Sequence, residues 1–188
     1  DHHERCFADG GPKLGHEYYY KFPLSEGIRC AYSALEVDNC ELAGFSHSAV
    51  RLEGGDGHRV HHCYIHHNQY NGLGYGVCVI KAVAQIDHNL FNYNRHSIAG
   101  TGDTPSGYEA CHNLELGVSL SHCFDMHGGR DRGDGTDVAG SWLKIHHNTF
   151  RQPMTSIHVR GQPCEGAVVH HNWFAGTTKV RHVMAGGK

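Results

Sequence analysis

Four side chains capable of acid–base chemistry or charge pairing stand at alternate positions in two short segments. Asp125 and His127 belong to one segment, and His158 and Arg160 belong to the other. Alternate residues of a β-strand lie on the same face, so the two residues of each segment would face the same way. A histidine beside a carboxylate can accept a proton, and a cation can neutralise a substrate carboxylate. We predict that these four residues are catalytic, together with Lys81.

This group of side chains suits β-elimination from a uronate-containing polysaccharide. In that reaction a base of lowered pKa removes the α-proton while Lys or Arg neutralises the uronate carboxylate. Hydrolysis of a glycoside needs two facing carboxyl groups instead, and Asp125 with Glu53 or Asp131 would supply them. The alternative without catalysis treats Glu53 and Asp125 as members of surface ion pairs with nearby cations, worth about 0–1 kcal/mol each.

A phrase that recurs along the chain supplies the elements that must position these side chains. It consists of an apolar residue, two polar residues and then Asn or Cys. Its copies end at Cys40, Cys63, Asn89, Asn113, Asn148 and Asn172. The intervals between these ends are 23, 26, 24, 35 and 24 residues. Repeats of about 20–50 residues are typical of solenoids, in which one unit buries its apolar face against the next.

A second segment of each repeat alternates apolar and polar residues, as a strand with one buried face does. The residues expected to point inward are Val50, Leu52, Ile98, Phe124, Met126, Ile157 and Val159. Aligned on the small residue that ends each segment, the outward residues form two columns. One column holds Glu53, Lys81, Thr101, His127 and Arg160, and the other holds Arg51, Val79, Ala99, Asp125 and His158. The alignment therefore places Asp125, His127, His158 and Arg160 on neighbouring rungs.

The turn phrases carry a resemblance to a known family. Those at residues 85–89, 146–150 and 170–172, with the Arg160-Gly161 pair, resemble phrases of pectate-lyase-like proteins, in which a turn Asn stacks on its counterparts above and below. The resemblance covers residues 27–188. It implies an all-β fold, a right-handed parallel β-helix of about six rungs over residues 28–188, preceded by a cap at residues 1–27. It also implies a polysaccharide ligand and lyase activity.

The longest interval of the repeat predicts a loop beside the catalytic candidates. Residues 128–137 leave the rung directly after His127, and loops inserted on a rigid scaffold commonly build sites. The loop carries three carboxylates, Asp131, Asp134 and Asp137, which we consider as ligands of a Ca²⁺ ion. The alternative is a solvated loop that holds no ion.

Residues around the catalytic candidates are predicted to bind the polysaccharide. They are Arg51, Glu53, His96, Thr101, Tyr108, Arg130 and Arg132. The cations would pair with acidic groups of the polymer, and the ring of Tyr108 would stack on a sugar. Packing of Tyr108 in the core is the alternative.

Histidine is unusually frequent, with 20 residues in 188. The repeat places five of them in one column, namely His62, His88, His112, His147 and His171. We interpret the column as a stack of imidazole rings beside the turn. A metal site, which needs three or four convergent ligands, is the alternative. Closely spaced rings cannot all be charged, so we predict neutral rings at pH 7 and a loss of stability as the pH falls through about 6.

Charge and cysteine content limit the partners and the cellular compartment that the protein can have. The net charge of −3, without a run of Lys or Arg, disfavours nucleic acid as a partner. No apolar stretch reaches the roughly 18–20 residues of a membrane span. Eight cysteines without C-x-x-C spacing favour disulfides and a secreted protein. Cys40 and Cys63 hold the same place in successive rungs, so we predict a disulfide between them, with Cys6–Cys30 as a second pair.

The sequence thus leads to a secreted β-helix protein that binds a polysaccharide and cleaves it by β-elimination. Glycoside hydrolysis is a further alternative. The contrasting hypothesis is a non-catalytic structural, adhesive or filament-forming module that self-associates through the ends of its coil.

Overall fold

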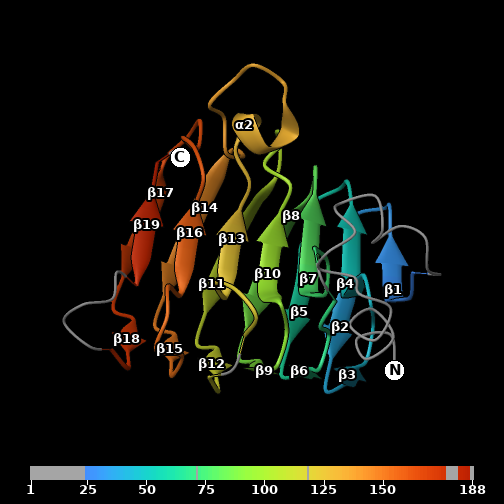
Figure 1. Ribbon diagram of the computed structural model, residues 1–188. Coiled ribbons are helices and arrows are strands. Elements are labelled where there is room, and N and C mark those ends of the chain that lie inside the picture. Colours follow the sequence, from blue (N-terminus) through green and yellow to red (C-terminus); the bar gives the residue numbers. More distant parts are fainter. Residues whose placement is uncertain (1–23, 71, 118, 177–181, 187–188) are drawn as a thin grey trace, which may run out of the picture.

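The computed structural model of the chain describes residues 24–70, 72–117, 119–176 and 182–186. These residues form three sheets of seven, six and six strands, here called sheets A, B and C (Figure 1). The chain passes from A to B to C and then returns to A, so neighbouring strands of one sheet come from successive coils. Neighbouring strands are parallel in all three sheets. The fold is therefore the solenoid that the repeat predicts, in the form of the parallel β-helix that the resemblance implies.

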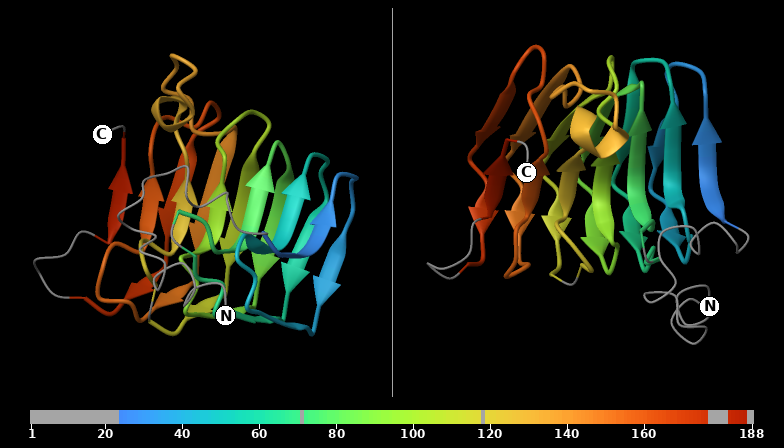
Figure 2. Two further views of the ribbon diagram at one scale, coloured as in Figure 1. Left: turned by 45° about the vertical axis from the view of Figure 1, so that its right-hand side comes forward. Right: turned by 45° about the horizontal axis from the view of Figure 1, so that its top comes forward.

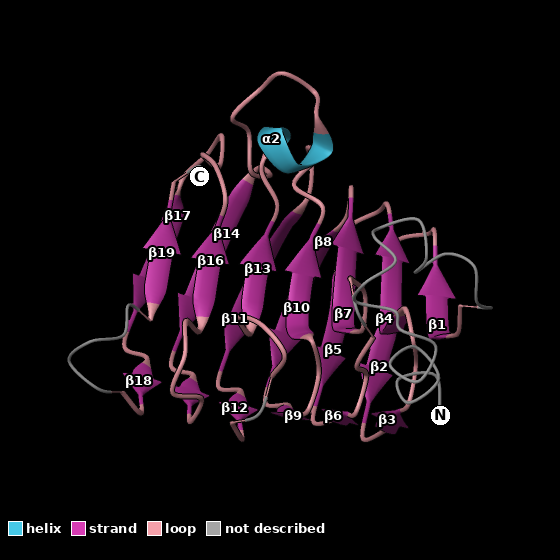
Figure 3. Cartoon of the chain, viewed as in Figure 1, coloured by secondary structure: helices cyan, strands magenta, loops and turns pink. Residues whose placement is uncertain are grey.

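Each coil contributes one short strand to each sheet, and turns join the strands (Figure 3). Sheet A consists of β1 (Glu26–Cys30), β4 (Ser48–Glu53), β7 (Tyr75–Ile80), β10 (His96–Gly100), β13 (Phe124–Met126), β16 (Ile157–Val159) and β19 (Val183–Ala185). Sheet B consists of β2 (Glu36–Asp38), β5 (His58–His61), β8 (Val83–Asp87), β11 (Gly107–Cys111), β14 (Trp142–His146) and β17 (Ala167–His170). Sheet C consists of β3 (Glu41–Ala43), β6 (Tyr64–His66), β9 (Leu90–Asn92), β12 (Leu114–Glu115), β15 (Thr149–Phe150) and β18 (Trp173–Phe174). Most of the predicted cap, residues 1–23, lies outside the described residues.

Stacked asparagines hold the turn between sheets B and C. The side chain of Asn113 donates to the carbonyl of Ile86 at 2.8 Å and to Oδ1 of Asn148 at 3.0 Å. Oδ1 of Asn113 in turn accepts from the backbone N–H of Asn89 at 2.9 Å. Asn89 and Asn148 repeat the pattern one coil away on either side. Because each buried amide bonds to the coils before and after it, the ladder locks their register. The predicted stacking is confirmed.

The interior of the coil is a continuous stack of apolar side chains. All seven residues predicted to point inward are buried there. Aromatic rings from successive coils also meet inside, with Phe124 edge-on to Phe150 at 4.9 Å and Phe150 stacked on Phe174 at 5.2 Å. The buried face of sheet A is thus fixed, and the alternate residues of its strands must face outward.

The register predicted for β7 is wrong by one residue. Glu53 lies opposite Ile80 rather than Lys81, and Val79 points into the core rather than outward. Lys81 adopts the left-handed conformation, with a φ of 49°. It helps to close a two-residue connection to β8, whereas the preceding coil uses residues 54–57 for the same connection. The small residue at the end of a segment does not mark the register when these turns differ in length.

The predicted disulfide between Cys40 and Cys63 is also wrong, because all described cysteines are free thiols. Sγ of Cys40 donates to the carbonyl of Asp38 at 3.2 Å, and Sγ of Cys63 donates to that of His61 at 3.1 Å. Each thiol therefore faces the backbone of its own turn rather than the other sulfur. The second predicted pair includes Cys6, which lies outside the described residues.

The longest interval of the repeat forms a loop between β13 and β14, as predicted. It carries α2 (Gly129–Arg132), the only helix in the part of the chain that the structure describes. The loop projects beyond the ends of the sheet A strands (Figure 2). Gly133 ends the helix in the left-handed conformation, with a φ of 69°. No helix among the described residues has the length and apolar character needed to cross a membrane.

Candidate functional site

Asp125 lies at the centre of a polar cluster on the outer face of sheet A. Its neighbours in β13, Phe124 and Met126, point into the core, so the alternation of the strand turns Asp125 outward. The carboxylate is nevertheless fully buried. Side chains from neighbouring coils cover it, including His96 from β10 and Arg160, which follows β16.

Four donor atoms surround the carboxylate of Asp125. Oδ1 accepts from Nε2 of His122 at 3.0 Å and from Nε of Arg160 at 2.9 Å. Oδ2 accepts from Nε2 of His127 at 2.9 Å and from Nη2 of Arg160 at 2.8 Å. Burial alone would raise the pKa of this carboxyl, but the hydrogen bonds from His122 and His127 hold the pKa well below its usual range. Asp125 is therefore an ionised acceptor at neutral pH.

His127 is the member of the cluster that reaches furthest into solvent. Its side chain is 29% exposed, compared with 11% for His122 and 12% for Arg160. Since Nε2 of His127 donates to Asp125, Nδ1 of the neutral ring carries the lone pair. A buried carboxylate that orients an imidazole in this way prepares it to act as a general base.

Arg160 joins the α2 loop to the strands of sheet A. Besides its two hydrogen bonds to Asp125, its Nη1 donates to Oδ1 of Asp131 at 3.3 Å. Burial opposes the ionisation of Asp131, but the N–H of Gly128 and the charge of Arg160 lower the pKa of its carboxyl. The predicted neighbours Asp125, His127 and Arg160 are thus brought together, and Asp131 is joined to them.

His96 and His158 flank the carboxylate on the coils on either side. Nδ1 of His96 donates to the carbonyl of His122 at 2.7 Å, and its Nε2 lies 3.9 Å from Oδ2 of Asp125. Burial lowers the pKa of His96 well below its usual value, although the charge of Asp125 opposes this. His158 lies opposite Asp125 in the sheet, and its ring packs edge-on against His122 at 4.9 Å. His122 and His158 line a hollow of about 220 Å³.

His122 is the member of the cluster that the sequence analysis does not select. It stands just before β13 and binds Asp125 as closely as His127 does. A signal for it exists in the alignment, which places His122 over His96 in successive repeats. A histidine stacked on a candidate histidine belongs to the same site.

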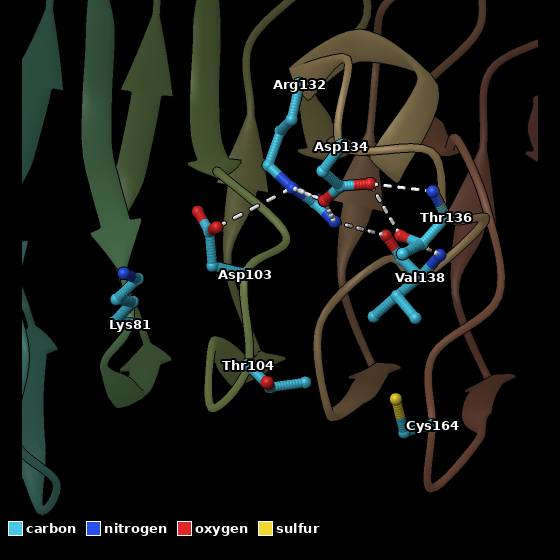
Figure 4. Close-up of a pocket in the computed structure, with 8 residues that line it drawn as sticks. All are labelled: Lys81, Asp103, Thr104, Arg132, Asp134, Thr136, Val138 and Cys164. Carbon is cyan, nitrogen blue, oxygen red and sulfur yellow. Dashed lines mark hydrogen bonds and ion pairs between the residues drawn. The ribbon is translucent and has the colours of Figure 1, made fainter.

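A second hollow, of about 420 Å³, lies beside the α2 loop (Figure 4). Arg132 pairs with Asp134 at 2.7 Å and with Asp103 at 3.6 Å, and it donates to the carbonyl of Val138 at 3.0 Å. Lys81 lines the opposite side of this hollow, and Figure 4 shows no interaction between it and the other labelled residues. Lys81 is therefore placed at a different hollow from the Asp125 cluster.

Arg51 and Glu53 belong to a separate group of ion pairs on the first coils. Nη2 of Arg51 lies 2.6 Å from Oε1 of Glu53. Between Arg51 and Asp125, the two intervening strands present Cys78 and Ala99 in the same column. The structure therefore does not bring Arg51 and Glu53 to the Asp125 cluster.

Three other predicted binding residues take different places. Tyr108 is buried in the core, and its hydroxyl donates to the backbone carbonyl of Asp125 at 3.3 Å. Its ring cannot stack on a sugar, contrary to the prediction. The carbonyl of Thr101 accepts from Nη1 of Arg132 at 3.0 Å, so both residues anchor the α2 loop. Arg130 projects from α2 with its side chain 60% exposed.

The three carboxylates of the loop do not form the Ca²⁺ ligand set that the sequence suggests. Asp131, Asp134 and Asp137 each pair with a different arginine. Among the described residues, three possible metal ligands lie within 4.8 Å of one another at two other places. These are His96–His122–Asp125 and Glu109–Cys111–His146. At the first, a cation would have to displace a donor that already binds the carboxylate.

The sequence matches the model of one protein family over nearly all of the coil. The match covers residues 26–187, and the family is described as a right-handed beta helix region. A search of curated proteins and a search of solved structures found no match. The family agrees with the observed fold, and the activity must be argued from the site.

Proposed function

Because the chain belongs to the right-handed β-helix family, we propose that it is a secreted protein that binds a uronate-containing polysaccharide and cleaves it by β-elimination. One observation carries this proposal: the partly exposed ring of His127 is held by the buried carboxylate of Asp125 on the outer face of sheet A. The regular side of a β-helix offers a long surface to a polymer, and α2 lies beyond the ends of the strands at one edge of sheet A (Figure 1).

His127 is the base in this mechanism. Its Nδ1 takes the proton from the carbon that bears the uronate carboxylate. The electron pair of the broken C–H bond forms a C=C bond, and the bond from the next carbon to the glycosidic oxygen breaks. The leaving oxygen then takes a proton from water. Asp125 stabilises the imidazolium that forms, as the carboxylate of a Ser-His-Asp triad does.

Two arginines have different tasks in the proposed reaction. Arg160 is largely buried and already binds Asp125 and Asp131, so it positions the base rather than the substrate. Arg130 is largely exposed on α2, 3.6 Å from Asp137. An exposed ion pair of this kind is worth about 0–1 kcal/mol, so a uronate carboxylate can replace Asp137 at little cost.

Hydrolysis by two carboxyl groups has less support from this site. A glycosidase of that type needs one protonated carboxyl as its acid. Hydrogen bonds and neighbouring cations outweigh burial and lower the pKa of both Asp125 and Asp131. Neither group therefore holds a proton at neutral pH.

The non-catalytic alternative also rests on a specific observation. The carboxylate of Asp125 is bound by four donor atoms, two from its own coil and two from Arg160 on the next coil. A network of this kind can hold two coils together without having any catalytic role. Cleavage of a polymer by the wild type, and its loss when His127 is replaced, would distinguish catalysis from this structural role.

The test is a lyase screen of the full chain on a panel of uronate polymers, read by the ultraviolet absorbance of the unsaturated product. We expect activity in the wild type and a loss of about 10²–10⁴-fold in His127→Ala, the usual contribution of a general base. His66→Gln is the matched control, because His66 lies on sheet C. We expect the control to keep wild-type activity.

Circular dichroism should first establish that all three proteins fold. New reducing ends without the unsaturated product would indicate hydrolysis instead. If the polymers bind but remain intact, the non-catalytic function is correct. Equal activity in His127→Ala and the wild type would remove His127 as the base.

A further inference from the structure

Three side chains of different chemistry meet on the outer face of sheet B, away from the Asp125 cluster. Glu109 and Cys111 stand at alternate positions of β11 and so face the same way. Cys111 lies opposite His146 of β14 in the sheet. The possible metal-binding atoms of these residues, one oxygen, one sulfur and one nitrogen, all lie within 4.8 Å of one another. The three groups therefore converge on one place.

The thiol of Cys111 is buried there without a hydrogen-bond partner. Cys111 is a free cysteine that is only 6% exposed. Among the described residues no hydrogen bond reaches its sulfur, whereas the thiols of Cys40 and Cys63 donate to backbone carbonyls and that of Cys123 donates to Gln152. A buried sulfur without a partner, beside a carboxylate and an imidazole, indicates a ligand that can take electron pairs from all three groups.

A zinc ion is such a ligand. In proteins Zn²⁺ binds carboxylate oxygen, imidazole nitrogen and thiolate sulfur, and its open sites combine three protein ligands with one water molecule. We propose that Glu109, Cys111 and His146 bind a Zn²⁺ ion, with water as the fourth ligand. Ca²⁺ and Mg²⁺ prefer oxygen ligands only, so this mixed set disfavours both.

The ion fits between the three groups after a small movement of Glu109. Zn–N bonds of about 2.0–2.1 Å and a Zn–S bond of about 2.3 Å place nitrogen and sulfur roughly 3.6 Å apart in a tetrahedral site. Nε2 of His146 points at Oε1 of Glu109, 2.9 Å away, and the ion enters between these two atoms. The Glu109 side chain is 33% exposed, so its carboxylate can move outward by roughly 1–2 Å and bind the ion from there. Bonds to the ion then replace the hydrogen bond between the two groups.

The contacts that orient the ring of His146 are kept when the ion binds. Nδ1 of His146 lies 2.9 Å from Nδ1 of His147, and its ring stacks on that of His170 at 4.9 Å. With Nε2 on the ion, Nδ1 carries the proton and donates it to His147, because a ligating histidine normally donates its other N–H to a fixed acceptor. His147 is itself held in the predicted column of histidines, whose rings stack at 4.9 to 5.1 Å. The proton changes place, and neither ring has to rotate.

Negative charge around the thiol favours a cation at this place. Asp87 lies opposite Cys111 on the neighbouring strand. Burial and the charges of Asp87 and Glu109 raise the pKa of the Cys111 thiol to about 11, although Arg59 opposes this. The thiol therefore keeps its proton at neutral pH until an ion binds, because only the thiolate is a ligand. Binding should release about one proton.

The first two coils provide a matched control for the histidine. Nε2 of His61 lies 2.9 Å from Oε1 of Glu36, which repeats the pair of Glu109 and His146. Asp38 stands opposite His61 where the proposed site has its cysteine. Its carboxylate accepts from the side chain of the adjacent Asn39, and Glu36, Asp38 and His61 are not among the groups of convergent ligands.

The test variants are Cys111→Ser and His146→Gln, and the matched controls are Cys164→Ser and His61→Gln. Cys164 is an exposed free thiol. The measurement is a calorimetric titration of each full-length protein with Zn²⁺ at pH 7.5, after circular dichroism has established the fold. Two buffers of different ionisation enthalpy give the number of protons released.

We expect the wild type and both controls to bind one ion tightly with the release of about one proton. Both test variants should bind it at least about tenfold more weakly. With Co²⁺ as a second probe, the wild type should show the ultraviolet absorption of a thiolate-to-cobalt charge transfer. Cys111→Ser should lose this absorption, and Cys164→Ser should keep it.

Three results would overturn the proposal. The first is the absence of Zn²⁺ binding to the folded wild type. The second is an equal loss of affinity in His146→Gln and His61→Gln, which would place binding at scattered histidines. The third is Co²⁺ binding without the thiolate absorption. Lyase activity has no part in this test, so its outcome is independent of the function proposed above.

Discussion

Glu115 and Asp125 show how differently one kind of group behaves when it is buried. Glu115 lies on β12 in register with Phe91 and Phe150, so its side chain enters the core. No hydrogen bond of normal geometry reaches its carboxyl oxygens from the described residues. Burial raises the pKa of Glu115 to about 7, although the Ser97 hydroxyl opposes this. Asp125 is just as buried, but its hydrogen-bond donors keep it ionised. The donors, rather than burial, decide the charge.

The raised pKa of Glu115 leads to a prediction at the scale of this residue. The usual Glu value is 4.5, so between pH 4.5 and about 7 the folded chain keeps a proton that the unfolded chain has lost. The contribution of Glu115 to stability is fully present below pH 4.5, and it is lost as the pH rises through about 7. We expect Glu115→Gln to gain up to about 3 kcal/mol over the wild type between pH 4.5 and pH 8. Urea unfolding at several pH values measures this difference.

The exposed Glu165 provides the control for this prediction. Glu165→Gln removes a carboxyl from the surface rather than from the core, so the stability of this variant should follow the wild type across the pH range. A constant difference between Glu115→Gln and the wild type would show that Glu115 does not change its charge there.

At the scale of the element, the turn between sheets B and C does most to hold successive coils together. It combines the buried asparagine ladder with an exposed histidine in the left-handed conformation just before each Asn. Asn and His tolerate this conformation better than most residues. The tight turn and the ladder therefore come from the same short phrase. The turn between sheets A and B has no such phrase, and its length differs from coil to coil.

Loss of one ladder amide should destabilise the turn strongly. Asn113→Ala removes the acceptor of the Asn89 N–H and the donor to the carbonyl of Ile86. Each buried group left without a partner costs about 1–3 kcal/mol. We therefore expect the free energy of unfolding to fall by about 2–5 kcal/mol. The adjacent, exposed His112→Asn is the control and should change it by less than about 0.5 kcal/mol. Similar values for both variants in urea unfolding would show that the ladder contributes little.

At the scale of the whole molecule, histidines should set the acid limit of stability. Burial lowers the pKa of His96 well below 6.5 and also lowers the pKa of His47. Desolvation between stacked rings, together with the charges of neighbouring imidazoles, lowers the pKa of the exposed His147. In the unfolded chain these rings take up protons as the pH falls through 6.5, and in the folded chain they do so only at lower pH. The unfolded state therefore binds more protons, and stability is lost as the pH falls below about 6.5.

Glu115 titrates in the opposite sense over the same range, so the comparison is made in Glu115→Gln. We expect the urea midpoint of this variant to decrease between pH 7 and pH 5, and the decrease to be smaller when His96→Gln is added. The comparison uses the change with pH, so a general loss of stability in the variant does not affect it. Equal midpoints at pH 5 and pH 8 in Glu115→Gln would contradict the prediction.

Much of the Asp125 cluster follows from the repeat, but its chemistry does not. The alternation of strands predicts that Asp125 and His127 face outward with His158 and Arg160 beside them, and the register of β10, β13 and β16 confirms this. It does not indicate that Asp125 is buried or that His122 binds it. Those facts depend on side chains that pack over the carboxylate, and an alignment of the repeats contains no information about such contacts. Lys81 fails for a different reason, since its turn has its own length.

The sequence by itself determined the coil, its apolar core, the stack of turn asparagines and the column of histidines beside it. A solenoid repeats one short unit at a fixed rise, so residues that recur in the phrase must stack, whatever else the chain does. Only the tertiary structure decided which outward side chains meet, which carboxyls keep a proton and which imidazole nitrogen is unprotonated. These properties depend on burial and on hydrogen-bond partners from other coils, and the α2 loop lies outside the repeat altogether. The phrase therefore specifies the scaffold, and contacts between coils specify the sites on it.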